Sequence, residues 1–324
     1  MKTRILLAVI SIIILVAAVS IISDFHQIFT PTKEKLVIAT TTSLYDTGLL
    51  DVLEASFEEE YPQYDVSFIA AGTGLALQYA SRGDADAVLV HAPLLEAKFM
   101  DEGYGVNRRI FAYNFFVIIG PKNDPAKIRG LNAVEALKRI AEAGRRGEAC
   151  WVSRGDNSGT HTKEKLLWKS AGFNPDELKG EEWYIESGAG MGRTLLLTNE
   201  VNAYTISDIG TYTKYWKENL IQLEILVEES EELINVYSFI AVNPNKVEDV
   251  NFKAAMKFAD FLVSSRCQEL IGEFGVKDYG RPLFKPAVPL LKGETKLQEA
   301  EWIKKYGFIN GEECPSKYRL PCQT

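Results

Sequence analysis

Short apolar runs and amphipathic runs alternate along most of this chain. The apolar runs have the length of buried strands, and the amphipathic runs have the spacing of helices that pack on a sheet. We expect strands at 36–41, 65–70, 86–91, 111–119, 149–153, 183–186, 202–206, 222–226 and 234–242. We expect helices at 47–61, 74–82, 94–102, 131–144, 160–171, 191–199, 208–218, 250–264, 266–274 and 294–306. This alternation predicts an α/β fold with mainly parallel sheets flanked by helices.

Two of the expected strands are unusually long and resemble each other in aromatic content. They run from Phe111 to Pro121 and from Leu233 to Pro244, and each ends at a proline. A chain that leaves one lobe, builds a second of about 115 residues and returns has two lobes joined by two crossover strands, which permits hinge closure on a ligand. We therefore expect lobe I at 35–115 and 236–290, lobe II at 116–235, and a C-terminal helix and tail at 291–324.

An apolar segment near the N-terminus predicts export. Lys2 and Arg4 precede an apolar run at 5–22 that only two serines interrupt. Positive charges stay on the cytoplasmic side, so the rest of the chain is expected outside the cytoplasm, at the cell surface or in the periplasm. The run is short for a membrane span and long for a cleaved signal. Residues 1–34 are thus either a signal peptide or a signal anchor with a tether, and weak cleavage-site chemistry favours the anchor.

Charge and cysteine content narrow the function classes. A net charge of −8 argues against nucleic acid as a partner. The four cysteines and three histidines match no metal-site spacing, so neither a bound metal cation nor a cofactor is expected. Cys314 and Cys322 bracket a short proline-containing loop and predict a local disulfide. For Cys150 and Cys267, free thiols and a bridge both stay open.

The octapeptide from Ser153 to Thr160 is the strongest single motif. It follows an apolar strand and precedes an amphipathic helix, so Ser158 and Thr160 are expected at a helix start. Unpaired backbone N–H groups at such a start, together with hydroxyls and the forked donors of Arg154, would form an anion cradle. The alternative is an ordinary capped turn in which Arg154 forms a structural pair with Asp156.

Three further helix starts carry hydroxyl or glycine residues after strands. They contain Thr42 with Ser43, Thr73, and Met191 with Gly192. In open α/β sheets, ligands bind beyond the carboxyl ends of the strands, where such turns gather. Each turn could be a simple helix cap, but together they favour one oxyanion site.

The segment from about Leu36 to Pro289 resembles the tungstate-binding proteins of ABC transporters, which have the type II periplasmic-binding-protein fold. The strings that carry this resemblance are Thr40-Thr41-Thr42-Ser43, Gly72-Thr73-Gly74, Gly83-Asp84-Ala85-Asp86-Ala87, His91-Ala92-Pro93, Tyr113-Asn114, Ser153 to His161, Trp183-Tyr184-Ile185-Glu186, Gly190-Met191-Gly192, Tyr204-Thr205, Asp208 and Gly210-Thr211-Tyr212. The resemblance implies a protein that captures a tetrahedral oxyanion outside the cell and delivers it to a permease. One departure is Ile209, where the family usually carries an arginine.

The resemblance also implies which residues contact the oxyanion. We expect contacts from lobe I and lobe II, with Asp156 orienting Arg154 from behind. The expected oxyanion-binding residues are Thr42, Ser43, Thr73, His91, Arg154, Ser158, Thr160, Met191 and Gly192. Side chains alternate along a strand, so only one of Thr42 and Ser43 is expected to point inward.

His91 is the residue expected to set selectivity. In related phosphate binders the matching position resembles an aspartate, which accepts the proton of hydrogen phosphate. Tungstate and molybdate carry no such proton, and a carboxylate beside them would be an unpaired like charge. We therefore expect His91 to face the anion and to exclude phosphate; the alternative is a buried histidine bonded to a backbone carbonyl.

Other functions stay open as alternatives. An enzyme is not expected, because Ser158 and His161 lie on one helix start without a nucleophile elbow. A sensor domain is less favoured than a transport receptor, because only four residues precede the apolar run. Molybdate, sulfate or phosphate are the alternative ligands to tungstate within the same fold.

Overall fold

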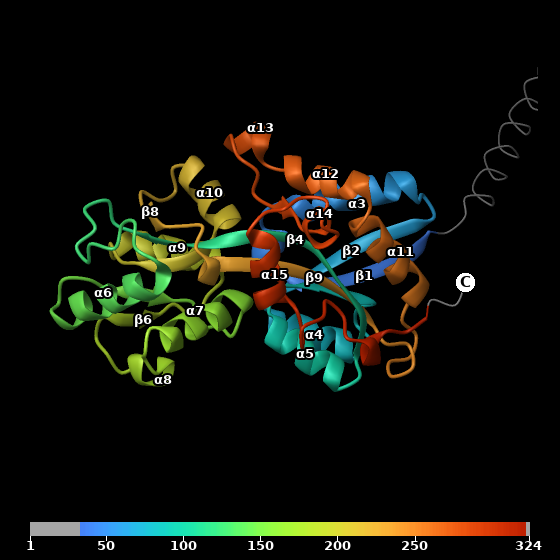
Figure 1. The fold of residues 1–324 in the computed structure, drawn as a ribbon, viewed down its shortest axis with the longest axis horizontal. Helices are drawn as coiled ribbons and strands as arrows, with labels where there is room; N and C mark the ends of the chain where they lie inside the picture. Colours follow the sequence, from blue (N-terminus) through green and yellow to red (C-terminus); the bar gives the residue numbers. More distant parts are fainter. Residues whose placement is uncertain (1–32, 322–324) are drawn as a thin grey trace, which may run out of the picture.

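Two long strands cross the middle of the molecule and join its two lobes. A computed structural model describes residues 33–321 of the chain. Strands β4 (Gly105–Gly120) and β9 (Ile234–Val242) pair antiparallel and run from one lobe into the other (Figure 1). They are the two predicted crossover strands, and β9 has its predicted bounds.

Lobe I is built on the sheet that contains the N-terminal part of β4. Its other strands are β1 (Glu34–Thr41), β2 (Tyr64–Ala71), β3 (Ala87–Val90), most of β9 and the short β10 (Lys285–Pro286). The strand order is β10-β4-β9-β3-β1-β2. The helices that flank it are α2 (Thr42–Tyr45), α3 (Leu49–Glu60), α4 (Thr73–Ser81), α5 (Pro93–Asp101), α11 (Phe252–Leu262), α12 (Ser265–Glu273), α13 (Val276–Tyr279) and α14 (Val288–Leu291).

Lobe II is built around the C-terminal part of β4. Strands β7 (Thr205–Asp208) and β8 (Glu224–Val227) both pair antiparallel with it. Strand β5 (Trp151–Ser153) pairs in parallel with β6 (Tyr184–Glu186), and a Trp151–Tyr204 bridge joins β5 to the start of β7. The helices are α6 (Ala133–Arg145), α7 (Gly159–Ser170), α8 (Pro175–Leu178), α9 (Met191–Glu200) and α10 (Ile209–Lys217), and the short 3-10 helix Glu231–Leu233 leads into β9.

The predicted α/β fold with two lobes is confirmed, but the sheets are mixed rather than mainly parallel. β1 is parallel to β2 and β3, whereas β9 is antiparallel to both β3 and β4. The reason is the crossover itself. A chain that enters lobe II along β4 must return along a strand of opposite direction, and that strand lies inside the sheet of lobe I.

Each predicted helix and strand overlaps an observed one, and the elements that were missed are short. Among these, α2 is a separate helix of four residues that begins at Thr42, before the helix predicted at 47–61. Side-chain caps explain why several helices begin where they do. Asn132 caps α6, Ser158 caps α7 and Asp208 caps α10, each by accepting a backbone N–H.

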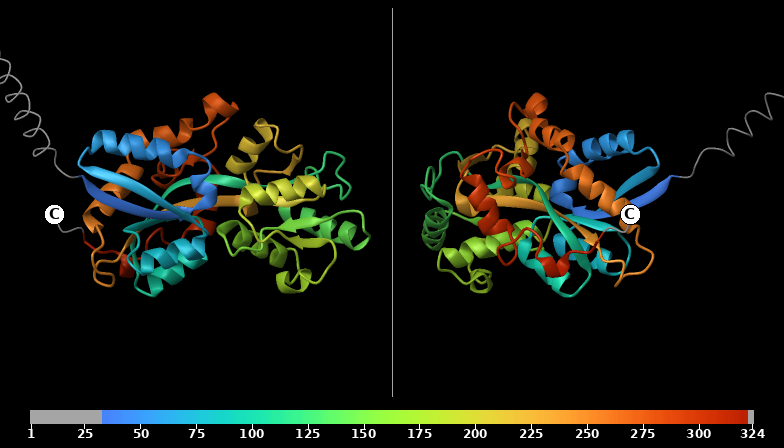
Figure 2. Two further views of the ribbon diagram at one scale, coloured as in Figure 1. Left: turned by 180° about the vertical axis from the view of Figure 1, so that it is seen from behind. Right: turned by 45° about the vertical axis from the view of Figure 1, so that its right-hand side comes forward.

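The C-terminal part of the chain packs against the strands that join the two lobes. Helix α15 (Glu299–Gly307) contacts β9, and it lies beside the crossover strands in Figure 1 and in the right-hand view of Figure 2. The Trp302 ring packs edge-on against Phe115, with ring centroids 6.2 Å apart. Beyond α15, Arg108 of lobe I donates a hydrogen bond to the Glu313 carbonyl (2.8 Å), shortly before the 3-10 helix Ser316–Tyr318. The end of the chain is therefore tied to both the hinge and lobe I.

Two predictions fall wholly or partly on residues that the structure does not describe. The apolar run at 5–22 lies outside the described residues, and so does Cys322 of the predicted disulfide with Cys314. No helix within 33–321 is long and apolar enough to cross a membrane. Cys150 and Cys267 are free thiols, so of the two alternatives for this pair the structure has the unbridged one.

Candidate anion-binding site

The turn between β5 and α7 brings several donors to one point. Strand β5 ends at Ser153, and the turn reverses direction through Gly155 and Asn157, both with positive φ (63° and 55°). The side chain of Ser158 caps α7 by accepting the His161 N–H at 3.2 Å. Because the first N–H groups of a helix have no partner within it, the start of α7 presents amides and a positive dipole end to the space between the lobes.

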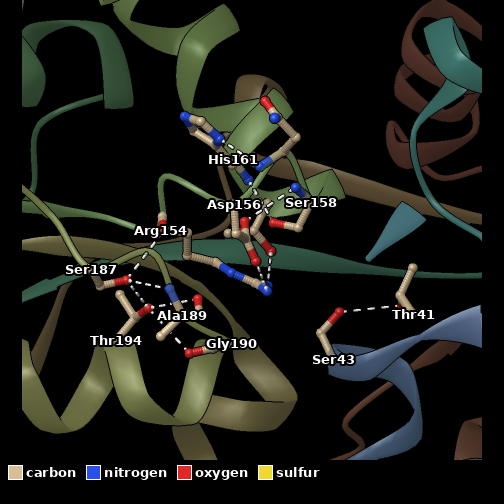
Figure 3. Close-up of polar contacts among 12 residues, drawn as sticks. Thr41, Ser43, Arg154, Asp156, Ser158, His161, Ser187, Ala189, Gly190 and Thr194 are labelled. Carbon is tan, nitrogen blue, oxygen red and sulfur yellow. Dashed lines mark hydrogen bonds and ion pairs between the residues drawn. The ribbon is translucent and has the colours of Figure 1, made fainter. Parts of the chain in front are cut away.

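Arg154 is buried in this turn and is only partly paired. Its side chain is 2% exposed, and one Nη forms an ion pair with Asp156 (Figure 3). The other Nη donates to Thr160 Oγ1 at 3.4 Å, and Nε has no hydrogen-bond partner among residues 33–321. Asp156 Oδ1 accepts the Ser158 N–H at 3.1 Å. The aspartate thus connects the guanidinium to the helix start, and one edge of Arg154 keeps a free donor.

The start of α9 lies beside this turn. Its N-cap, Gly190, offers no side-chain cap to Met191 and Gly192, the first two residues of the helix. Ser187 Oγ donates to the Arg154 carbonyl at 3.2 Å, which ties the α9 start to the arginine turn (Figure 3). A Cβ at Gly192 would lie 1.9 Å from the Tyr215 hydroxyl, so a larger residue there would require the Tyr215 side chain to move.

The lobe I side of the site consists of hydroxyl groups. Thr41 caps α2, and its Oγ1 lies 3.3 Å from Ser43 Oγ (Figure 3). Ser43 is buried, whereas Thr42 at the first position of α2 is half-buried. Thr73, the first residue of α4, is 0% exposed, and its hydroxyl has no hydrogen-bond partner in the described chain. A buried hydroxyl without a partner is rare in folded proteins and calls for a further polar group, either a ligand or a water molecule.

His91 lies where the two lobes meet. Its Nε2 is 3.4 Å from Ser43 Oγ of lobe I, and a Cβ at Gly159 of lobe II would lie 2.8 Å from its ring. Its Nδ1 is 2.8 Å from Asn235 Oδ1, so it bonds to a side-chain amide and not to a backbone carbonyl. Burial, opposed by the hydrogen bond with Asn235 and assisted by the charges of Arg154 and Lys163, lowers the pKa of His91 to about 4. The ring is therefore neutral near pH 7.

The structure thus brings the predicted residues together in two groups. His91 and Ser43 are in contact on lobe I, and Arg154, Asp156, Ser158 and Thr160 are in contact on lobe II. Thr42, Thr73, Met191 and Gly192 lie at the starts of α2, α4 and α9. Contact with an anion stays a prediction for all of these residues.

Two asparagines that sequence reasoning did not select support the site. Asn114 on β4 and Asn235 on β9 are direct partners in the antiparallel pairing, and Asn235 Nδ2 donates to Asn114 Oδ1 at 2.9 Å. A signal was present in the sequence, because each is the single amide within one of the two strands predicted at 111–119 and 234–242. Asp208 is a further buried carboxylate near the site; burial raises its pKa, while Thr211 and the charge of Arg154 act in the opposite direction.

Ile209 lies where the resemblance described above leads us to expect an arginine. It is the first residue of α10 and packs in an apolar cluster with Met191 and Tyr212. Its side chain therefore contributes packing behind the start of α9.

Ser158 and His161 do not form a nucleophile–base pair. Ser158 Oγ accepts the backbone N–H of His161, and the imidazole Nδ1 instead accepts the Asn157 N–H at 2.9 Å. Burial lowers the pKa of His161. Within 33–321 no group of three or more His, Cys, Asp or Glu side chains could hold a metal ion.

Glu164 on α7 holds β5 and β6 beneath the arginine turn. Its carboxylate is buried and accepts hydrogen bonds from Trp151 Nε1 (2.8 Å), the Tyr184 hydroxyl (2.7 Å) and Ser153 Oγ (2.9 Å). Burial raises the pKa of Glu164, although the hydrogen bonds from these three donors act in the opposite direction. Because each donor is buried, the carboxylate is the acceptor on which lobe II packing depends.

Replacing Glu164 by leucine is expected to lower stability by about 3 kcal/mol, since it leaves buried donors unsatisfied, and to lower the melting temperature by about 6 °C. Glu164→Gln is the matched control, because its carbonyl still accepts from Trp151 and Tyr184 and its amide can donate to the Ser153 hydroxyl. Thermal unfolding followed by circular dichroism measures both. Equal melting temperatures for the leucine and glutamine variants would contradict this role.

Comparisons with known proteins agree with the fold and cover most of the chain. Residues 29–266 match the family model of the PBP superfamily domain. The tungstate-binding protein TupA of Peptoclostridium acidaminophilum is 40% identical over 260 residues, covering 79% of this chain and 87% of that protein. The solved structure of the tungstate-binding protein TupA from Desulfovibrio alaskensis G20 is 42% identical with a TM-score of 0.68, covering 78% of this chain and 98% of that one. The structure of the tungstate ABC transporter from Geobacter sulfurreducens is 44% identical with a TM-score of 0.67, covering 75% and 100%.

Proposed function

The chain belongs to the PBP superfamily, and from this premise we propose that it is the substrate-binding protein of an ABC transporter and captures tungstate. The ligand would lie between the lobes, held by the hydroxyls of lobe I and by the arginine turn of lobe II. Relatives that are 40% and 42% identical over 79% and 78% of the chain are named as tungstate-binding proteins, which supports this choice of ligand.

The observation that carries the proposal is the buried, incompletely paired guanidinium of Arg154. A charge in this position needs anionic partners, and Asp156 engages one Nη. Nε is left without a partner among the described residues, as is the Thr73 hydroxyl in the opposite lobe. Unpaired donors contributed by both lobes suit a tetrahedral dianion, whose four oxygens accept from all sides.

We propose that the protein binds its ligand and catalyses no reaction. The relatives are binding proteins of transporters, and Ser158 and His161 lack the bond that a nucleophile and its base would share. We further propose that the protein works outside the cytoplasm, that the apolar run at 5–22 attaches it to the membrane, and that its macromolecular partner is the permease subunit.

Binding of a panel of oxyanions tests the function. We expect the full chain, kept in mild detergent because of its apolar N-terminal run, to bind one tungstate per protein in isothermal titration calorimetry. Molybdate, which has the same charge and nearly the same size, should bind with an affinity within about a hundredfold, a difference of under 3 kcal/mol. Sulfate and phosphate should bind far more weakly. Tight phosphate binding without any response to tungstate would overturn the proposed ligand.

A further inference from the structure

A line of hydrogen bonds runs from a backbone carbonyl in lobe I to the candidate site. Asn114 Nδ2 donates to the Leu283 carbonyl at 3.3 Å, and Asn235 Nδ2 donates to Asn114 Oδ1 at 2.9 Å. Next, His91 Nδ1 lies 2.8 Å from Asn235 Oδ1, and His91 Nε2 lies 3.4 Å from Ser43 Oγ. All five residues are buried or contribute a buried atom.

The chemistry of these groups determines the direction of every bond in the line. A backbone carbonyl can only accept, so Asn114 turns its NH2 to Leu283 and its oxygen to Asn235. Asn235 then turns its own oxygen to His91, which means that Nδ1 of the imidazole carries the hydrogen. In a neutral ring the other nitrogen, Nε2, is therefore a bare acceptor.

The direction of these bonds also determines where the hydroxyl hydrogens at the edge of the site point. His91 Nε2 accepts the hydrogen of Ser43, at a long 3.4 Å. Thr41 Oγ1 already accepts the Leu44 N–H, so its own hydrogen is free to point at Ser43 Oγ. Both hydroxyls then present lone pairs to the space between the lobes, whereas an oxyanion needs hydrogens.

We infer that Asn114 and Asn235 are positioning residues that set this direction, and that binding a proton-free oxyanion at Ser43 takes up one proton at His91 Nε2. The protonated ring donates to Ser43 Oγ, and the Ser43 hydroxyl hydrogen turns to the anion. The proton comes from solvent, and no other bond forms or breaks. The inference rests on the proposed function, because it assumes that the anion lies beside Ser43.

The groups around His91 explain why the proton arrives only with the anion. Arg154 from the β5–α7 turn and Lys163 from α7 both oppose a positive ring, and burial lowers the pKa of His91 to about 4. Tyr237 of β9 packs 4.9 Å from the ring and is neutral, since burial raises its pKa well above the usual value. Phe116 of β4 and the hydroxyl of α2 carry no charge. A doubly negative ligand favours the protonated ring and therefore raises the pKa of His91.

Proton uptake at His91 makes the tungstate affinity depend on pH. Below the pKa of the free ring His91 already holds the proton, and above the higher pKa of the complex neither state holds it. Between the two values, binding takes up a proton, so tungstate affinity falls as pH rises from the pKa of the free ring to the pKa of the complex, and it levels off above that value.

Calorimetry of the full chain with sodium tungstate in two buffers of different ionisation enthalpy measures this uptake. Near pH 7 we expect between about 0.5 and 1 proton taken up per tungstate bound, because one group titrates. Tungstate binding without net proton uptake would overturn the inference alone. Absence of any tungstate binding would overturn the proposed function and the inference with it.

Three variants locate the proton. His91→Gln cannot titrate and should bind tungstate without proton uptake. His161→Gln is the matched control, since this second buried histidine is outside the line and its loss should leave the uptake unchanged. Asn235→Asp places a carboxylate against Nδ1–H, so His91 should already be protonated and the uptake should fall although tungstate still binds. Undiminished uptake in either His91→Gln or Asn235→Asp would contradict the assignment.

Discussion

Replacing Arg154 by glutamine is expected to weaken tungstate binding by a factor of about a hundred to a thousand, since two charge-assisted hydrogen bonds contribute about 3–4 kcal/mol. Arg154 is the buried cation of the candidate site, and its unpaired Nε is the donor best placed for an anion oxygen. Glutamine keeps a donor but loses the charge and the fork. Calorimetric titration with tungstate measures the change.

Two further variants separate charge from geometry. Arg154→Lys keeps the positive charge but places it on a single ammonium group. It should give an intermediate affinity, because it cannot form two parallel hydrogen bonds. Arg146→Gln removes an arginine from an exposed pair with Glu148 and should bind like the unaltered protein. Melting temperatures without ligand show whether each variant is folded. A folded Arg154→Gln variant with unchanged tungstate affinity would remove Arg154 from the site.

Replacing His91 by aspartate is expected to weaken tungstate binding by about a hundredfold or more and to favour phosphate over tungstate. An ionised carboxylate beside a proton-free dianion is an unpaired like charge in a buried place, which costs several kcal/mol. Hydrogen phosphate carries a proton that the carboxylate can accept, so its loss should be smaller. The ratio of the two dissociation constants is the quantity to measure.

His91→Asn is the control for this change, because it removes the imidazole without adding a charge. Its amide can still donate toward Asn235 Oδ1, the present partner of Nδ1. The phosphate preference should appear only in the aspartate variant. Unchanged tungstate affinity in His91→Asp would place His91 outside the site.

The sequence predicted the elements of the fold well because burial leaves a local pattern. Strand β9 is buried at every position, and its run of apolar residues ends at a proline, so its bounds were predictable. The direction of pairing was not, since nothing within β9 tells whether its neighbours in the sheet run with it or against it. The four-residue helix α2 was also missed, because it is shorter than two turns and has no periodicity to detect.

The candidate site was predictable where one turn holds several donors, and less so where distant residues meet. Arg154, Asp156 and Ser158 are neighbours in sequence and in space. Asn235, in contrast, lies 144 positions from His91, and only the antiparallel pairing of β4 with β9 brings it there. Thr41 can cap α2 only because β1 ends at this residue. A strand one residue longer would not leave Thr41 at the cap position.

The packing of the C-terminal helix bears on the order in which the chain can fold. The apolar core of lobe II includes Trp151, Trp168 and Ile206 from the middle of the chain together with Ala300 and Ile303 of α15. During synthesis these two residues emerge long after the others. The apolar cluster can therefore be completed only once α15 has been made, and part of it stays uncovered until then.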